Sequence, residues 1–219
     1  SSMFGGCANL TTAPELPATT LATECYNNMF YMCTSLTTAP ELPATELADY
    51  CYYQMFYGCT SLTSAPALPA TTLADACYFY MFYGCSSLTT APALPATTLS
   101  GNCYYGMFKG CSSLTEMNLP EGVTSVGASA FEGCSSLEEI TMPIGITSIG
   151  GKAFYNCSKL KEIAIPSKVT VLNDSTFYGC KKLSYVKALF VTQPGILYTN
   201  NWLYDVAASG TFIKGKYAF

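Results

Sequence analysis

Large hydrophobic residues recur along this chain at two fixed spacings. Met-Phe pairs lie 26 residues apart in the first half, at positions 3–4, 29–30, 55–56, 81–82 and 107–108. The spacing then falls to 23 residues, and the pairs become Ala130-Phe131, Ala153-Phe154 and Thr176-Phe177. A regular period in this range is typical of a solenoid, in which each unit packs only on its two neighbours.

The order of apolar positions within one unit predicts its elements. In the short unit over residues 131–154, Ile140 and Met142 alternate as in a strand, and Pro143 follows them. Helical or 3₁₀ spacing then relates Ile146, Ile149 and Ala153. Each unit should therefore hold a strand, a turn and a short helical segment.

The first four units carry three more residues than the later ones, and the pattern of their second half differs. Leu47, Cys51 and Met55 are spaced by four, which predicts α-helical turns in the long units and tighter 3₁₀ turns in the short ones. Gly precedes most of the recurrent cysteines, as Gly58 precedes Cys59. This position predicts a left-handed residue that ends the preceding helical segment.

Residues between the apolar strand positions should face outward. In the long units a proline recurs among them, and proline donates no backbone hydrogen bond, so we expect an extended ribbon there and regular strands only in the short units. This outward face is the first candidate binding surface, and it comprises Thr38, Pro40, Glu41, Ser64, Pro66, Thr90, Pro92, Glu116, Asn118, Glu139 and Thr141.

The unit resembles the leucine-rich repeat of the bacterial BspA-like (Treponema-type) family, with its signature F-x-x-C-x-x-L-x-x-I-x-I-P-x-x-V-x-x-I-x-x-x-A-F. Residues 108–183 follow that signature closely, and residues 4–106 keep its F-x-x-C-x-x-L start and its Leu-Pro step. The resemblance implies an α/β fold, a right-handed leucine-rich-repeat solenoid of about eight units. Its convex side would be α-helical or 3₁₀, and its concave side would hold extended segments or parallel strands.

The domain organisation follows from the two periods. We expect a solenoid over residues 1–183, with long units over 1–106 and short units over 107–183. The period fails after Leu183, and residues 184–219 begin with one more strand-like run and contain Trp202, the single tryptophan. Because the end of a solenoid needs its core covered, we predict that 184–219 form a C-terminal cap. The first unit shows no comparable segment, which favours the interpretation that further residues precede it in the full-length protein.

Twelve cysteines occupy two recurrent positions. Eight lie three residues after the phenylalanine that recurs once in each unit. The other four occur only in the long units, at positions that the short units fill with Val126, Ile149 and Leu172. A position that accepts cysteine or an aliphatic residue indicates a buried thiol used as a small hydrophobe.

Two alternatives for the cysteines stay open. Stacked cysteines about 5 Å apart could form disulfides, although their side chains point the same way, and metal binding lacks the usual C-x-x-C pair.

Tyrosines also recur at unit spacing. One predicted ladder contains Tyr26, Tyr52, Tyr78 and Tyr104, and another contains Tyr31, Tyr57 and Tyr83. Stacking that seals adjacent units is one interpretation. The alternative is an exposed aromatic strip on the convex side that binds a carbohydrate or a protein, formed by Tyr53, Tyr57, Tyr83 and Tyr105.

Composition excludes several functions. The chain has no His and no Arg, and its ten Lys all follow residue 106, so His-dependent catalysis and a phosphate-tracking nucleic-acid surface are both excluded. No Gly-rich phosphate loop and no cooperating carboxylate pair is present. We therefore predict no catalytic residue, no cofactor and no metal. No apolar run reaches the ~18–20 residues of a membrane span, so we predict no transmembrane segment in this chain.

The resemblance implies a non-enzymatic extracellular adhesion scaffold that is secreted or located at the cell surface. Its partner would be a protein or glycan of a host or neighbouring cell, and we expect the chain itself to be a monomer. Two other hypotheses stay open: a structural spacer or stalk that presents another domain, and a carbohydrate-binding accessory module.

Overall fold

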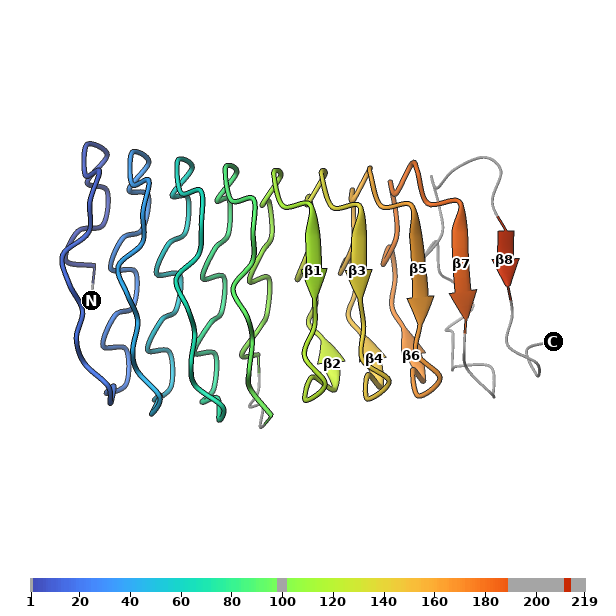
Figure 1. The fold of residues 1–219 in the computed structure, drawn as a ribbon, viewed down its shortest axis with the longest axis horizontal. Coiled ribbons are helices and arrows are strands. Elements are labelled where there is room, and N and C mark those ends of the chain that lie inside the picture. The colour runs from blue at the N-terminus through green and yellow to red at the C-terminus, as the bar shows by residue number, and fades with distance from the viewer. Residues whose placement is uncertain (1, 98–101, 189–210, 214–219) are drawn as a thin grey trace.

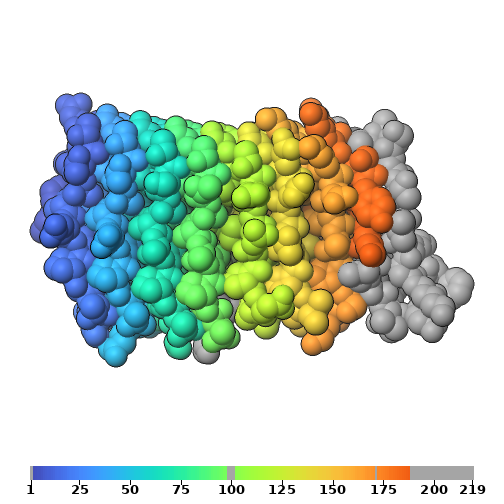
Figure 2. Space-filling view, in the orientation of Figure 1, coloured from blue at the N-terminus to red at the C-terminus, as the bar shows by residue number. Residues whose placement is uncertain are grey.

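The computed structural model describes residues 2–97, 102–188 and 211–213 of the chain. It is a stack of similar coils that follow one another along a single axis (Figure 1). In the space-filling view, each unit forms a band that contacts the bands before and after it (Figure 2). The solenoid predicted from the sequence period is therefore confirmed.

The short units and the residues that follow Leu183 contribute strands to a face that we call the strand face. Its strands are β1 (Glu116–Asn118), β3 (Glu139–Thr141), β5 (Glu162–Ile165), β7 (Tyr185–Ala188) and β8 (Thr211–Ile213). β1 pairs with β3, while β7 lies between β5 and β8, and all these pairs are parallel. The register advances by one unit, so that Glu116 lies beside Glu139. The strand-like run predicted after Leu183 is β7, and β8 also falls in the predicted cap. Residues 189–210, including Trp202, and 214–219 lie outside the described residues.

A second set of very short strands occupies the positions for which we predicted 3₁₀ turns. These are β2 (Ser125–Val126), β4 (Ser148–Ile149) and β6 (Val171–Leu172), which form one parallel sheet in the order β2-β4-β6. The 3₁₀ prediction for the short units was wrong. Spacings of three and four do not distinguish a tight helical turn from a strand that ends in a turn.

The strand face of the long units is an extended ribbon. The described ribbon pairs only through isolated parallel bridges, and three of them link Thr12, Thr38, Ser64 and Thr90 in turn. Prolines follow two residues after each of these, at 14, 40, 66 and 92, and their missing N–H groups interrupt a continuous ladder. The predicted contrast between a proline ribbon and later strands is confirmed.

The opposite side of each unit, which we call the turn side, is a chain of overlapping β-turns. Alternate amides close turns within the unit, as Met29 N–H donates to the Tyr26 carbonyl at 3.2 Å. The amides between them donate to the next unit, as Phe30 N–H donates to the Met55 carbonyl at 3.0 Å. The described residues contain no α-helix or 3₁₀-helix, so the predicted helical turns of the long units were also wrong.

The spacing of the units explains why helices do not form. Adjacent strands lie ~4.7–4.9 Å apart, whereas packed α-helices need 8–10 Å between their axes. Equivalent phenylalanine rings of successive units are only 5.3–5.8 Å apart along the whole stack. A turn chain fits this spacing because it sends half of its hydrogen bonds across to the neighbour.

The turn chain has a four-residue period, which we had read as helical from the spacing of Leu47, Cys51 and Met55. Every fourth backbone position is left-handed in the long units, for example Tyr50, Gln54 and Gly58, with φ of 56°, 52° and 70°. The short units hold two such residues instead of three, as at Ser129 and Gly133. The predicted left-handed position before each cysteine is confirmed, but it ends a turn and caps no helix.

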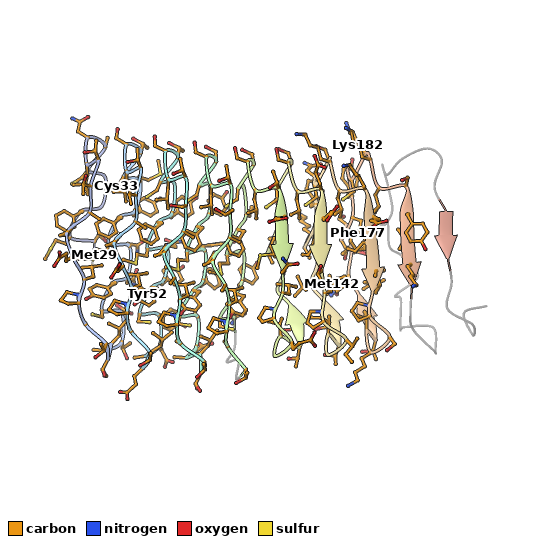
Figure 3. The ribbon with its side chains drawn as sticks, in the orientation of Figure 1. Met29, Cys33, Tyr52, Met142, Phe177 and Lys182 are labelled. Atoms are coloured by element: carbon orange, nitrogen blue, oxygen red, sulfur yellow. The ribbon has the colours of Figure 1, made fainter. Side chains whose placement is uncertain are left out.

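The core is built from stacked identical residues. Phenylalanines form an unbroken ladder of near-parallel rings from Phe4 to Phe177. In Figure 3 the side chains of Met29, Cys33 and Tyr52 lie within the stack, whereas Lys182 lies at its rim. Because the rings repeat at the unit spacing, each unit buries its apolar face only by contact with the next.

Substituting one rung of this ladder tests its contribution. Phe82→Ala removes a fully buried ring that stacks on Phe56 and Phe108, and we expect a loss of about 3–5 kcal/mol in unfolding free energy from urea titration. Ile144, which is 71% exposed, provides the control, and Ile144→Ala should change stability by less than about 0.5 kcal/mol. Equal effects of the two substitutions would contradict the ladder as the core.

Candidate functional site

The strand face presents most of the residues of the first candidate surface to solvent. Eight are exposed: Thr38, Glu41, Ser64, Thr90, Glu116, Asn118, Glu139 and Thr141. Pro66 and Pro92 are half-buried, and Pro40 is buried, so the prolines contribute less surface than the outward pattern predicted. The structure therefore brings these residues onto one face, with hydroxyls and carboxylates outermost.

Hollows interrupt this face where proline segments meet the following unit. One, of about 370 Å³, lies between Thr90–Pro95 and Glu116–Asn118 at the change from long to short units. Another, of about 580 Å³, is lined by Ala13–Pro17 with Pro40, Glu41 and Pro43. Both are shallow grooves between neighbouring ribbons that have no backbone ladder between them.

The charges on the strand face are sparse and solvent-exposed. The Lys161 ammonium hydrogen-bonds to the Glu138 carboxylate and holds the pKa of that carboxyl below its usual range. Glu116 and Glu139 lie side by side in the register of β1 and β3, and both are exposed. Ion pairs and carboxylates at such exposed positions contribute little to stability.

The turn side of the long units carries a larger feature, which we call the aromatic cluster. It comprises eight half-buried or exposed rings in mutual contact: Tyr31, Tyr50, Tyr53, Tyr57, Phe79, Tyr80, Tyr83 and Tyr105. Two stacked ladders form its body. Tyr31, Tyr57 and Tyr83 stack at 4.9 and 4.3 Å, and Tyr53, Phe79 and Tyr105 stack at 5.1 and 4.7 Å.

Tyr80 joins the two ladders. Its ring meets Phe79, Tyr83 and Tyr105 at 68–74°. A Cβ at Gly106 would lie 2.1 Å from the Tyr80 ring, so glycine at this left-handed position leaves room for the tyrosine. Burial raises the pKa of Tyr80 to about 12, and the nearby Tyr105 adds to this effect, so the phenol stays neutral at physiological pH.

Lys109 ends one of the ladders. Its ammonium lies 5.6 Å from the centre of the Tyr83 ring and 3.1 Å from a Glu132 carboxylate oxygen. The tyrosine line thus stops where the first lysine of the chain appears. This arrangement covers the ring face that the ladder would otherwise leave open.

The sequence prediction found half of the aromatic cluster. The structure brings all four residues of the predicted strip, Tyr53, Tyr57, Tyr83 and Tyr105, into one surface. Phe79 was missed, although it is the unit-spaced equivalent of Tyr53 and Tyr105 and the period could have found it. Tyr80 gave no such signal, because its equivalents are Gln54 and Gly106.

The other predicted tyrosine ladder is structural. Tyr26, Tyr52, Tyr78 and Tyr104 stack at 5.8–6.1 Å. Tyr52 and Tyr78 are only 1% exposed, and burial raises the pKa of both. Within the described part of the chain, the Tyr52 hydroxyl has no hydrogen-bond partner.

The cysteines fill buried, hydrogen-bonded positions. Ten of the twelve are buried, and all twelve carry thiols rather than disulfides in the described residues. Seven thiols donate to the carbonyl of the phenylalanine one unit earlier, as Cys59 Sγ donates to Phe30 O at 3.1 Å. Cysteine therefore supplies a small apolar volume together with a donor that an aliphatic residue lacks.

The described residues offer no metal centre and no membrane span. No group of three or more His, Cys, Asp or Glu converges among residues 2–97, 102–188 and 211–213. Over the same residues, no helix is long and apolar enough to cross a membrane.

Comparison with known proteins relates this geometry to a family. The BspA type leucine rich repeat region matches residues 1–107 and 101–192, in six copies. A leucine rich cell surface protein from Faecalibacterium prausnitzii A2-165 is 28% identical, with a TM-score of 0.60 over 81% of this chain and 46% of that one. No curated protein sequence shows significant similarity to the chain.

A second solved structure shares the fold. It is a leucine-rich repeat protein from Bacteroides ovatus ATCC 8483, 22% identical, with a TM-score of 0.57 over 87% of this chain and 52% of that one. The chain thus spans about half the length of both solved proteins.

Thiol accessibility tests the burial of the cysteine ladders. In the native protein we expect a thiol reagent to modify Cys7 and Cys25, the two exposed cysteines, and all twelve should react after denaturation without reductant. Mass spectrometry of the labelled protein gives both counts. Fewer than twelve reactive thiols in the denatured state would establish disulfides, and rapid native labelling of Cys85 would contradict its burial.

The same burial predicts a loss of stability in alkali. Burial raises the pKa of Cys51, Cys59, Cys134 and Cys180 from 9.0 to about 12. Below about pH 9 both folded and unfolded thiols are protonated, so their full contribution is present. Between about pH 9 and 12 only the thiols of the unfolded chain ionise, and each of them lowers the free energy of unfolding by about 1.4 kcal/mol per pH unit. Urea unfolding midpoints should be flat up to about pH 8 and fall steeply above about pH 9; an unchanged midpoint at about pH 10.5 would contradict this.

Proposed function

Because this chain belongs to the BspA-type leucine-rich-repeat family, we propose that it is a non-enzymatic binding scaffold, secreted or held at a cell surface, that recognises a protein or a glycan. The similarity to a cell surface protein supports this location. The observation that carries the binding role is the aromatic cluster. Eight contiguous rings are partly exposed on a chain whose core is already filled by other aromatic ladders.

The chemistry of the cluster suits recognition. Tyrosine gives a large contact area with few rotatable bonds and adds a hydroxyl that donates and accepts hydrogen bonds, so it is enriched in binding surfaces. Here the rings are held by stacking at 4.3–5.1 Å and by Tyr80 between the ladders. A partner would therefore meet a surface whose side chains lose little freedom on binding.

The thiols and carboxylates favour binding over catalysis. Burial raises the pKa of the ladder thiols, so they hold no reactive thiolate at neutral pH. The carboxylates Glu116 and Glu139 are exposed on the strand face, and the groove that Glu116 borders is shallow and open to solvent. A rigid spacer is the second candidate, favoured by the phenylalanine ladder that continues without a break across the change of unit length.

Substitution of cluster tyrosines distinguishes the two functions. We expect the Tyr53→Ser and Tyr57→Ser double variant to bind its ligand at least about ten-fold more weakly, because it removes two rings from the contact. The assay is a screen of the protein against extracellular matrix proteins and a glycan array, followed by calorimetry with the ligand found.

Two control variants make the result specific. Tyr155→Ser removes a stacked tyrosine from the short units, away from the cluster, and should leave affinity unchanged. Ser64→Arg places a bulky charge on the strand face. If only Ser64→Arg loses binding, the ligand binds the strand face. If the screen finds no ligand, the spacer function is favoured.

A further inference from the structure

A hollow of about 320 Å³ lies where the last long unit meets the first short units. Its walls come from four successive units and include Asn102, Tyr105, Ser125, Ala128, Ser148 and Asn173. This volume is at the lower end of the range for small-ligand sites in proteins. The hollow adjoins the aromatic cluster, because Tyr105 belongs to both.

The hollow exists because the unit length changes here. The long unit has an additional left-handed turn at Asn102, with φ of 55°. The next units have the two-residue strands β2 and β4 at this place, so the left-handed turn at Asn102 has no equivalent turn to pack against. Gly127 and Gly150 also line the hollow, and both are glycines because the backbone of the preceding unit lies close: a Cβ would meet the Tyr104 carbonyl oxygen at 3.3 Å from Gly127 and the Ala128 nitrogen at 2.4 Å from Gly150.

One wall of the hollow is an aromatic face. Phe79 covers one side of the Tyr105 ring, at 4.7 Å between centroids and 5° between planes. The equivalent residue one unit further on is Ala128, which has no ring to cover the other side. Tyr105 and Ala128 both line the hollow, so the open face of the Tyr105 ring borders it.

The remaining walls carry neutral polar groups. Asn102 and Asn173 supply amides, and Ser125 and Ser148, adjacent in the register of β2 and β4, supply hydroxyls. The Asn173 side-chain NH₂ donates to the Ile149 carbonyl at 2.9 Å, which fixes the amide and leaves its oxygen as an acceptor. Among the described residues that line the hollow, none is charged.

We propose that this hollow is a binding subsite for an uncharged saccharide. The proposal rests on the proposed function as a binding scaffold, and it names the class of ligand that binds where the last long unit meets the first short units. A sugar ring presents an apolar C–H face and a rim of hydroxyls. The open Tyr105 face matches the first, and the amides and serine hydroxyls match the second. The end of an oligosaccharide chain enters between the units, and the rest of the chain follows the surface.

The neutral lining also sets the selectivity. A sialylated or sulfated sugar would bring an anion into a hollow without a cation to pair with it, and a partly desolvated, unpaired charge is costly. A peptide with a charged terminus or side chain meets the same penalty. Neutral glycans should therefore be preferred.

The experiment uses the full chain against neutral hexasaccharides of glucose, galactose, mannose and N-acetylglucosamine, with sialylated and sulfated glycans as charged comparisons. Affinity is measured by calorimetry and the contact residues by NMR. We expect Tyr105→Ala to weaken binding at least about ten-fold, while Tyr105→Phe stays within about three-fold because the ring remains. Ser125 is exposed and lines the hollow, so the long side chain of Ser125→Arg would fill it. This variant should abolish saccharide binding without loss of stability.

Several outcomes would overturn the assignment. Glycan binding that is unchanged in Tyr105→Ala and Ser125→Arg would place the saccharide elsewhere, and a preference for charged glycans would contradict the neutral lining. If no saccharide binds but a protein ligand is lost in the Tyr53→Ser and Tyr57→Ser variant, the subsite is wrong and the binding scaffold stands. The Tyr155→Ser control should bind saccharide normally, which shows that removing a distant tyrosine has no general effect.

Discussion

The hydrogen bonds that run from each unit to the next control this structure. On the turn side half of the amides donate along the stack, as Phe30 does to Met55, and on the strand face parallel pairing does the same. Both require neighbouring units to lie at the spacing of strands, ~4.8 Å. That spacing excludes packed α-helices and forces each residue to lie on its own equivalent in the next unit.

Stacking of equivalents has chemical consequences. Aromatic positions become ladders of parallel rings, as from Phe4 to Phe177. Cysteine suits the crowded position after each phenylalanine, since it is small and its thiol donates to the phenylalanine carbonyl of the preceding unit. Because each residue lies on its equivalent in the next unit, a side chain exposed once per unit recurs along the surface. One exposed tyrosine per unit therefore gives an extended aromatic surface.

The proposed binding features lie where the repetition is broken. Tyr80 joins two ladders because its equivalents are Gln54 and Gly106, and Lys109 ends a tyrosine line by covering Tyr83. At the change from long to short units, the turn at Asn102 has no equivalent in the units that follow, and Tyr105 borders the hollow that results. A stack of identical units would have no such boundary.

The sequence by itself determined the solenoid, the two unit lengths, the proline ribbon, the buried cysteines and the tyrosine ladders, because each follows from a residue type that recurs at a fixed period. It also placed Tyr53, Tyr57, Tyr83 and Tyr105 on one surface. Only the tertiary structure decided between a helix and a turn chain for Leu47, Cys51 and Met55, since a spacing of four fits both and the unit spacing excludes one. Tyr80 and the hollow beside Tyr105 likewise depend on contacts between units that differ, and a period describes only what units share.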